Sequence, residues 1–521
     1  MQLSGVAVAR PVLEQSHEDG EDSMYYVSTR DHSLQYTPAQ AIAQGLSRDG
    51  GLFLPVSIPK LPEGALKKMT GMTYQQRAQY IMSLYLEDFT AEELGQFAEK
   101  AYGPDKFDTP AVAPLKKVDD GTYCLELWHG PTSAFKDMAL QLLPRLMTVS
   151  MQKSGDGKEI VILVATSGDT GKAALEGFCN VPGIRIVVFY PEEGVSPLQK
   201  LQMATQEGEN VFVAAIQGNF DDAQSGVKKL FCDPQIATAL QKQNRVFSSA
   251  NSINWGRLLP QIVYYVSAYC DLVRDEQIAL GDPINVCVPT GNFGNILAAY
   301  YAKQMGLPIH KLICASNKNN VLTDFISTGT YDRNRPFYPT TSPSMDILIS
   351  SNLERLLFHL TDEDDSIVRQ LMEDLKNEGR YTVPQQVLSR LQADFAGGFS
   401  DEEETAATIK RLFDTYSYLC DTHTAVAVSV YEDYCARTGD DTKTVIASTA
   451  NPFKFPHAVL TALGGKTQGA DEFEIAQKLE EISGCEMPNQ LAGLREKTVR
   501  FTETFSKNRM DDALTKALQN V

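Results

Sequence analysis

No apolar run in this sequence of 521 residues reaches the roughly 18 residues that a membrane-spanning helix needs, so the sequence predicts no membrane partner. Positive charge is also scarce, because 47 Lys and Arg stand against 66 Asp and Glu and give a net charge of −19. A protein of this charge is repelled by nucleic acid and by anionic membrane surfaces, and no nucleic-acid partner is expected. An anionic small substrate stays possible, since a local cluster of donors can override the overall field.

Patterns for metal binding and for disulfides are missing as well. The 9 cysteines include no Cys-x-x-Cys spacing, and the 7 histidines form no His-Glu-x-x-His pair. Most of the cysteines lie in apolar stretches, as buried free thiols do, which favours a reducing compartment. Residues 1–23 are acidic and lack the cationic start and apolar stretch of a secretory signal. We therefore expect a cytoplasmic protein without a metal site, and a disordered tail over residues 1–23.

Short apolar runs rich in β-branched residues alternate with helical stretches over the middle of the chain. Continuous apolar runs of this length indicate parallel strands that are buried on both faces. The sequence therefore predicts an α/β fold with open parallel sheets. The expected strands are Ile160–Ala165, Ile184–Tyr190, Val211–Ile216, Val246–Ser249, Ile284–Val288, Leu312–Ala315 and Val445–Ser448.

Changes in composition divide the chain further. After the tail, residues 24–105 have a mixed composition and are predicted to form an N-terminal cap domain. Residues 106–460 are predicted to form the catalytic α/β core, and residues 461–521 to form C-terminal helices. Within the core, residues 353–416 are rich in charge and show no clear strand, so we expect a helical insertion there.

One stretch, Leu127 to Asp137, reads Leu-Trp-His-Gly-Pro-Thr-Ser-Ala-Phe-Lys-Asp. Gly and Pro fix a turn, and Thr132 or Ser133 is expected to accept hydrogen bonds from the start of the helix that follows. Lys136, held on this turn beside apolar side chains, is predicted to be partly desolvated, which lowers its pKa and exposes a nucleophilic amine. A Schiff-base lysine requires this environment. The alternative is a solvated lysine that opens a helix, and this stretch alone does not separate the two.

A second loop, Val288 to Asn295, follows a predicted strand and precedes a helix expected over Ile296–Met305. It reads Val-Pro-Thr-Gly-Asn-Phe-Gly-Asn, and backbone N–H groups at the start of a helix bind anions. The spacing is neither that of the P-loop nor the dinucleotide pattern Gly-x-Gly-x-x-Gly. It favours a mononucleotide or a phosphorylated cofactor over a triphosphate.

Two more loops rich in small and hydroxyl residues follow predicted strands, at residues 165–172 and 447–452. In open α/β sheets, ligands bind at the carboxyl ends of the strands. A structural turn is the alternative for the first loop, and a helix cap for the second. A lysine on a turn, a phosphate-binding loop and the hydroxyl of Thr449 are together the parts needed to hold pyridoxal phosphate.

These motifs together resemble threonine synthase, a family of the fold-type II (tryptophan synthase β-like) pyridoxal-phosphate enzymes. The resemblance runs from Tyr26 to about Pro456, and the length with its late helical insertion looks like the longer microbial and fungal-type members. It implies that the chain is a lyase of threonine biosynthesis that converts O-phospho-L-homoserine and water to L-threonine and phosphate. The matching motifs are Tyr26–Arg30, Gly45–Pro55, Leu127–Asp137, Ser167–Gly171, Asn251–Arg257, Gly291–Asn295 and Ser448–Pro452.

The resemblance also implies roles for single residues. Lys136 is the implied catalytic residue, which binds the cofactor covalently and then moves protons at Cα and Cβ of the substrate. His129 is expected to be packed and hydrogen-bonded rather than to face the cofactor. The implied cofactor-binding residues are Lys136, Gly291, Asn292, Phe293, Gly294, Asn295 and Thr449 (the last at the pyridine nitrogen), and the implied substrate-binding residues are Ser167, Asp169, Thr170, Lys172, Asn251 and Arg257.

Three other functions remain open at this stage. A phospho-lyase that releases 2-oxobutyrate and phosphate, and a serine or threonine dehydratase, would need the same lysine and phosphate-binding loop. The cationic residues Lys172 and Arg257 favour a phosphorylated substrate over a dehydratase. The intact Lys136 motif argues against a binding protein that has lost catalysis. The sequence leaves the assembly as a monomer or a homodimer.

Overall fold

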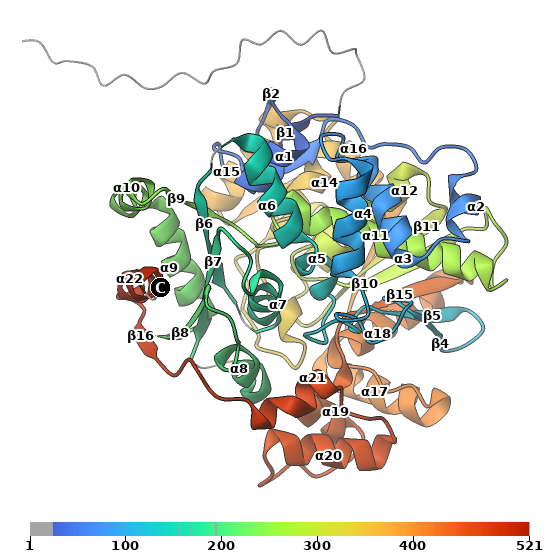
Figure 1. The fold of residues 1–521 in the computed structure, drawn as a ribbon. Helices are drawn as coiled ribbons and strands as arrows, with labels where there is room; N and C mark the ends of the chain where they lie inside the picture. The colour runs from blue at the N-terminus through green and yellow to red at the C-terminus, as the bar shows by residue number, and fades with distance from the viewer. Residues whose placement is uncertain (1–23, 156, 167, 193–194, 520–521) are drawn as a thin grey trace, which may run out of the picture.

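Two largely parallel sheets form the centre of the molecule, and every strand predicted from the apolar runs belongs to one of them (Figure 1). The fold is taken from a computed structural model, which describes residues 24–155, 157–166, 168–192 and 195–519. The predicted tail over residues 1–23 and the candidate residue Ser167 lie outside the described residues. Among the described residues, no helix is long and apolar enough to cross a membrane.

The first sheet has five strands in the order β16-β8-β7-β6-β9, and all of its neighbouring strands are parallel. Four of its strands are predicted from their apolar runs; the residues of β6, β7 and β8 are mostly buried on both faces of the sheet, whereas those of β9 are mostly half-buried. The strands are β6 (Glu159–Ala165), β7 (Ile184–Pro191), β8 (Val211–Gln217), β9 (Arg245–Ser248) and β16 (Thr504–Ser506), with helices α7 (Asp169–Phe178), α8 (Pro197–Ala204), α9 (Phe220–Cys232), α10 (Pro234–Lys242) and α22 (Met510–Gln519).

The second sheet has six strands in the order β14-β11-β10-β15-β5-β4, of which only β4 is antiparallel to its neighbour. Because β10, β15 and β5 are adjacent and parallel, the loops that follow them lie in a row along one edge. The elements are β4 (Leu115–Lys117), β5 (Thr122–Glu126), β10 (Ile284–Pro289), β11 (Ile309–Ser316), β14 (Phe395–Phe399) and β15 (Thr444–Ser448), with α5 (Asp137–Leu140), α6 (Leu143–Ser154), α11 (Trp255–Arg274), α12 (Gly294–Met305), α13 (Val321–Thr328) and α18 (Thr422–Thr438).

The N-terminal part is a small antiparallel sheet followed by helices that pack on the core. Thr37 caps the first helix through a capping box, as the Thr-Pro pair predicts. The ring of Trp255 at the start of α11 packs against Tyr26 and Tyr85, so this part shares the main hydrophobic core. Its elements are β1 (Tyr26–Ser28), β2 (Asp31–Tyr36), β3 (Phe53–Pro55), α1 (Pro38–Gln44), α2 (Ala65–Met69), α3 (Tyr74–Ser83) and α4 (Ala91–Ala101).

The prediction of a strand-free insertion over residues 353–416 is wrong in one respect. Besides α14 (Leu353–Leu360), α15 (Asp365–Asn377), α16 (Gln385–Asp394) and α17 (Glu402–Tyr416), the segment contains β14 and the short β13 (Arg380–Thr382), which pairs with β12 (Thr330–Asp332). The strand β14 reads Phe-Ala-Gly-Gly-Phe and joins the edge of the six-stranded sheet. Because glycine is depleted in strands, the sequence does not indicate that β14 is a strand. A Cβ on Gly398 would lie 2.7 Å from Cγ1 of Val430, which explains the glycine at that position.

The prediction that residues 461–521 form only helices is also incomplete. The helices α19 (Pro456–Ala462), α20 (Glu472–Ser483) and α21 (Asn489–Ala492) lie beside the six-stranded sheet. The chain then crosses to the other side of the molecule, where β16 pairs with β8 and α22 packs on α9, as the red segment in Figure 1 shows. The last part of the chain therefore contributes to both halves of the core.

Candidate active site

Lys136 stands directly before α5, on a turn that is tied to the end of β15. The N–H of Phe135 donates to the carbonyl of Thr449 over 2.8 Å, and the N–H of Asn451 donates to the carbonyl of Ser133 over 3.0 Å. Two loops that lie more than 300 residues apart in the sequence are thus joined by backbone hydrogen bonds. The residue before the lysine is thus hydrogen-bonded to Thr449, and the structure brings together two of the groups that the sequence analysis combined as parts of a cofactor site.

The turn before Lys136 is fixed by Asp137. Its buried carboxylate accepts hydrogen bonds from the N–H and the hydroxyl of Thr132, over 2.8 and 2.7 Å. Burial raises the pKa of Asp137 to about 6, against the effect of these hydrogen bonds. The expectation that Thr132 or Ser133 caps the helix is wrong, because α5 has no side-chain cap and Ser133 instead accepts from Nε2 of Gln490. The turn is therefore held by the carboxylate of Asp137, which bonds back to Thr132, and not by a hydroxyl cap on the helix.

The amine of Lys136 has no hydrogen bond or ion pair within the residues that the structure describes. The residue as a whole is partly exposed, and its Nζ lies 4.8 Å from the centre of the Phe135 ring. Removal from water lowers its pKa to about 8; Asp169 opposes this shift, while Arg257 and Lys454 add to it. Such an amine is partly neutral and nucleophilic near neutral pH. The environment fits a reactive lysine and not a solvated one.

The loop Gly291–Asn295 leaves its donors free. None of the backbone N–H groups of these residues donates a hydrogen bond to another described residue, and α12 begins at Gly294. The loop is held through its carbonyls instead, because Oγ of Ser350 donates to Gly291 over 2.8 Å and Nδ2 of Asn352 donates to Asn292 over 3.0 Å. A Cβ on Gly291 would lie 2.5 Å from the carbonyl oxygen of Ser344. Free N–H groups at a helix start fit a phosphate.

Two residues of this loop, Phe293 and Asn295, have an unusual backbone or side-chain environment. Phe293 adopts a left-handed backbone with a φ of 61° directly before α12, an uncommon conformation for a residue with a side chain. Asn295 is buried, and its Oδ1 accepts from the hydroxyls of Tyr264 and Tyr265. Its Nδ2 has no partner among the described residues. A buried donor without a partner indicates a place for a ligand acceptor.

Thr449 presents a hydroxyl at the carboxyl end of β15. The residue is buried, and its hydroxyl makes no hydrogen bond to the described part of the chain. By contrast, the neighbouring Oγ of Ser448 is fully engaged, since Trp128 and Thr424 both donate to it over 3.0 Å. Only the hydroxyl of Thr449 is therefore available to a group bound beside Lys136.

The loop after β6 provides a second set of free donors. Oγ1 of Thr166 accepts from the N–H groups of Gly168 and Gly171, which shapes the loop. The N–H groups of Asp169 and Thr170 at the start of α7 have no partner among the described residues, and neither does the hydroxyl of Thr170. These donors fit a small anion such as a carboxylate.

The side chains of two predicted substrate residues on this loop point to protein partners. The carboxylate of Asp169 is buried and lies 2.8 Å from Nζ of Lys454. Burial opposes its ionisation, but Lys454 and Lys136 outweigh burial and hold its pKa below the ordinary range. The ammonium of Lys172 lies 3.3 Å from Glu176 and also donates to Gln206. The ammonium of Lys172 is thus engaged by protein partners.

Arg257 is a buried cation without a counter-ion. It lies in the first turn of α11 with 3% of its surface exposed, and Nη1 donates to the carbonyl of Ala250 over 2.6 Å. Its Nε has no partner, and no carboxylate of the described residues lies within ion-pair distance. Burial lowers its pKa to about 10. A buried unpaired charge is costly, so this position calls for an anionic ligand. Asn251, six residues earlier in the loop that precedes α11, is partly exposed, and its side chain is free of hydrogen bonds to described residues.

His129 faces acids and not the candidate site, as predicted. Nδ1 lies 2.6 Å from Asp108, Nε2 lies 3.1 Å from Glu126, and the ring stacks on Trp128. Burial opposes the charge, but the two carboxylates raise the pKa of His129 to about 9. The side chain is a packed cation that supports the Lys136 turn.

Lys454 was not among the predicted site residues, although it acts on the candidate site. This lysine is fully buried in the short 3-10 helix Pro452–Lys454 and acts electrostatically on Lys136. The available signal was a single charge between two phenylalanines, Phe453 and Phe455, close after Thr449. A lysine between aromatic residues is rarely solvated on all sides.

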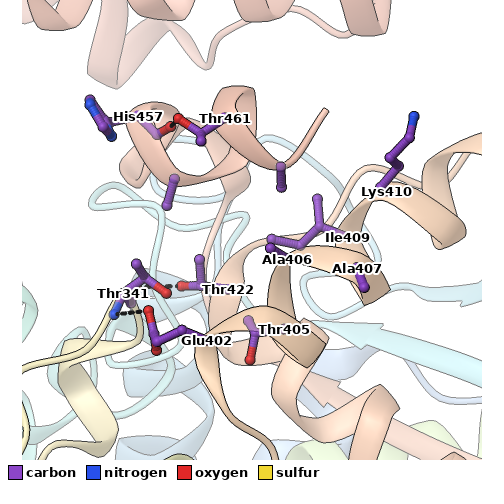
Figure 2. A pocket seen from close by; sticks show the side chains of 12 residues that line it. Thr341, Glu402, Thr405, Ala406, Ala407, Ile409, Lys410, Thr422, His457 and Thr461 are labelled. Carbon is purple, nitrogen blue, oxygen red and sulfur yellow. Dashed lines mark hydrogen bonds between the residues drawn. The ribbon is translucent and has the colours of Figure 1, made fainter. Parts of the chain in front are cut away.

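A separate hollow of about 450 Å³ lies between α17 and α19 (Figure 2). The N–H of Thr341 donates to Glu402 over 3.1 Å, and the hydroxyl of Thr422 donates to the carbonyl of Thr341 over 2.8 Å. None of the predicted site residues lines it. The hollow is a different place from the site around Lys136, and its wall holds the segment that leads to Ser344.

Comparison with known families covers most of the described length. The family "Threonine synthase N terminus" matches residues 25–102, "Pyridoxal-phosphate dependent enzyme" matches residues 108–450, and "Threonine synthase, C-terminal" matches residues 424–512. The second match contains Lys136, the loop Gly291–Asn295 and Thr449.

Individual relatives agree with these matches. The human protein named Threonine synthase-like 1 is 44% identical over 436 residues, which are 82% of this chain but only 58% of that protein. Threonine synthase of Schizosaccharomyces pombe is 38% identical over 467 residues, which are 84% of this chain and 89% of that protein. The crystal structure of threonine synthase from Brucella melitensis with bound pyridoxal phosphate superposes with a TM-score of 0.84 at 37% identity, covering 95% of this chain and 99% of that one.

Proposed function

Because the chain belongs to the threonine synthase family of pyridoxal-phosphate-dependent enzymes, we propose that it converts O-phospho-L-homoserine and water to L-threonine and phosphate. The observation that carries the substrate assignment is the buried guanidinium of Arg257, which has no counter-ion among the described residues and acts electrostatically on Lys136. A substrate with a phosphate group supplies the missing anion. A serine or threonine dehydratase, whose substrate has no phosphate, would leave Arg257 unpaired.

The residues around Lys136 fit pyridoxal phosphate. The amine of Lys136 is free to bind the aldehyde, the N–H groups of Gly291–Asn295 are free to bind the phosphate, and the hydroxyl of Thr449 is free to meet the ring nitrogen. When bound, the cofactor withdraws electrons and so stabilises negative charge on the carbon atoms of the substrate. Thr449 is neutral, so it does not hold a proton on the ring nitrogen as a carboxylic acid would.

The substrate is bound at both of its charged ends. Arg257 binds the leaving phosphate, and the free side chain of Asn251 adds a donor from the loop before α11. The N–H groups of Asp169 and Thr170 bind the α-carboxylate at the start of α7, where the helix dipole favours negative charge. These two anchors fix the carbon chain of the substrate relative to Lys136.

Lys136 moves the protons of the reaction. In the proposed reaction its amine would take up, one after the other, the protons that leave Cα and Cβ as the γ-phosphate departs, and protons would be returned to Cγ and, after water has added its hydroxyl group at Cβ, to Cα. Its pKa of about 8 suits both directions near neutral pH, because a useful acid-base group titrates close to the working pH.

The test is incubation of the purified chain and pyridoxal phosphate with O-phospho-L-homoserine, with threonine, phosphate and 2-oxobutyrate measured together. Threonine and phosphate in equal amounts support the proposal. Phosphate with 2-oxobutyrate and no threonine identifies a phospho-lyase instead. The cytoplasmic location and the assembly as a monomer or homodimer stay predictions.

A further inference from the structure

The ammonium of Lys454 lies at a junction of three chain segments. It has no exposed surface, and it lies 2.8 Å from Oδ1 of Asp169, 2.9 Å from the carbonyl of Thr132 and 3.3 Å from Oε1 of Gln202. Lys454 and Thr132 follow strands of the six-stranded sheet. Asp169 and Gln202 lie on α7 and α8, the helices that follow β6 and β7 of the five-stranded sheet. The ammonium therefore binds both halves of the core at once.

The carboxylate of Asp169 makes the same connection from the other side. Nε2 of Gln199 on α8 donates to it over 3.0 Å. Oγ of Ser344, which lies beside the loop after β10 of the six-stranded sheet, donates to it over 3.4 Å. Each member of the pair thus has partners in both halves. The contacts cross the boundary beside the site where cofactor and substrate are proposed to bind.

Stability alone is a weak reason for such a pair. Replacing a buried ion pair by apolar residues is often neutral or stabilising, because desolvation of both charges offsets their attraction. The position of this pair supplies a better reason. Thr132, which accepts from Lys454, is also bonded to Asp137, the residue next to Lys136. Lys454 is therefore linked through Thr132 to Asp137, in the turn that presents the reactive amine.

We propose that Lys454 and Asp169 form an ion-pair clasp that joins the two sheets beside the Lys136 turn, with Lys454 as a positioning residue, and that the two charges together set the electrostatic environment of the Lys136 amine. The clasp deepens the proposed function, since it rests on Lys136 being the lysine that binds the cofactor. Neither residue of the clasp is a proton donor or acceptor in the reaction.

The charges around Lys136 give the clasp a distinctive signature. The groups that act on the amine are Asp169 and Asp137, which favour its protonated form, and Arg257 and Lys454, which oppose it. Asp169→Asn removes an attraction and lowers the pKa of Lys136, whereas Lys454→Met removes a repulsion and raises it. The double variant removes both charges and returns the pKa toward that of the unchanged protein.

The experiment measures the amine directly. The full-length chain, freed of cofactor, is labelled with trace acetic anhydride at a series of pH values, and acetylation of Lys136 is followed by peptide mass spectrometry. We expect the titration of Lys136 to shift in opposite directions in the two single variants, because each removes one of the opposite charges that act on the amine. Lys454→Arg keeps the charge and is expected to keep the titration close to that of the unchanged chain.

A matched control separates electrostatics from loosening of the fold. Arg77 and Asp271 form another buried ion pair, 2.7 Å apart, between α3 and α11. Asp271→Asn is expected to lower the melting temperature without moving the titration of Lys136. The clasp is refuted if the two single variants shift the titration in the same direction, or if neither shifts it more than Asp271→Asn does.

A second readout uses the loaded protein. With pyridoxal phosphate bound, the pH dependence of the visible absorption band is expected to shift with the same opposite signs in Asp169→Asn and Lys454→Met. If the unchanged chain never develops this band, the proposed function fails, and the acetylation result still decides on the clasp. If the band is present in all variants and titrates identically, the clasp fails while the cofactor assignment stands.

Discussion

The N–H of Phe135 donates to the carbonyl oxygen of Thr449 over 2.8 Å, and Ala134 and Ala450 form a β-bridge beside it. The residue before the reactive lysine is therefore fixed to the residue proposed to meet the cofactor ring by main-chain atoms. A side-chain substitution at Lys136 or Thr449 leaves this connection in place. The effect of each such variant can be assigned to the group removed.

The first prediction concerns Lys136 itself. Lys136→Ala removes the amine proposed to bind the aldehyde, so the visible absorption band and turnover are both expected to disappear. Lys153→Ala is the matched control, because Nζ of Lys153 lies 5.1 Å from the centre of the Phe89 ring, a contact like that of Lys136 with Phe135. The control is expected to keep both properties. Survival of the band in Lys136→Ala contradicts the assignment.

The second prediction concerns the substrate phosphate. Arg257→Gln removes a buried cation that pairs with the ligand, at a cost of ~2–5 kcal/mol, which corresponds to a rise in KM of about thirtyfold or more. The affinity for pyridoxal phosphate, measured by absorbance titration, is expected to change far less.

Arg77→Gln provides the comparison for the second prediction. It also removes a buried guanidinium, but one that is paired with Asp271. This variant is expected to lose stability and to keep KM. Equal losses of substrate and cofactor affinity in Arg257→Gln would place Arg257 at the cofactor.

The third prediction tests the phosphate loop. Gly291→Ala places a Cβ 2.5 Å from the carbonyl oxygen of Ser344, so the loop must move. Overpacking of this kind costs ~1–3 kcal/mol, and most of it is expected to appear as weaker binding of pyridoxal phosphate. Gly493→Ala is the control, since no atom lies within 4 Å of its added Cβ. Unchanged cofactor affinity in Gly291→Ala would move the phosphate away from this loop.

The fourth prediction is a pH dependence. Attack on the aldehyde needs the neutral amine, and the pKa of Lys136 is about 8, below its ordinary value of 10.5. The association rate of pyridoxal phosphate with the cofactor-free chain is therefore expected to rise about tenfold between pH 7 and pH 9 and then to level off. Stopped-flow absorbance measures it. A rate that keeps rising through pH 10 would indicate an ordinary lysine.

The fifth prediction concerns His129, whose pKa is raised to about 9 in the folded state from an ordinary 6.5. The stabilisation by its two carboxylate contacts is present in full below pH 6.5 and is lost as the pH rises through 9. His129→Gln is expected to lower the free energy of unfolding by about 1.5–3 kcal/mol at pH 6 and by much less at pH 10, measured by urea denaturation.

His32 is the matched control for the fifth prediction. It lies 3.3 Å from Asp365 with 59% of its side chain exposed, so His32→Gln is expected to change stability little at either pH. Cofactor binding is expected to persist in both variants. Loss of the cofactor in His129→Gln would show that His129 does more than support the turn.

Much of the fold follows from local sequence, for a clear physical reason. A parallel strand buried on both faces must be largely apolar, so strands such as β6 and β10 can be recognised from the sequence. The strands β14 and β16 do not, because one is rich in glycine and the other has only three residues, Thr504–Ser506. Their pairing is decided by partners distant in the sequence.

The site divides in the same way. Lys136, the loop Gly291–Asn295 and Thr449 carry local motifs, and the family they indicate is confirmed by the comparisons. The engagement of Lys172 with Glu176 and Gln206 and the burial of Lys454 against Asp169 arise only from packing between segments. The sequence identifies which residues are chemically special, but not which charges cancel one another.

The pairing of β16 with β8 determines when the five-stranded sheet can be completed during synthesis of the chain. Residues 159 to 248 supply the other strands of the five-stranded sheet, yet the strand that covers the edge of β8 emerges only after some 250 further residues. Until then, the half of the molecule that contributes Asp169 carries an open sheet edge. Because N-terminal segments of a growing chain emerge first, the last stretch made completes a sheet begun early. The half of the molecule with the five-stranded sheet is thus completed after the half with the six-stranded sheet.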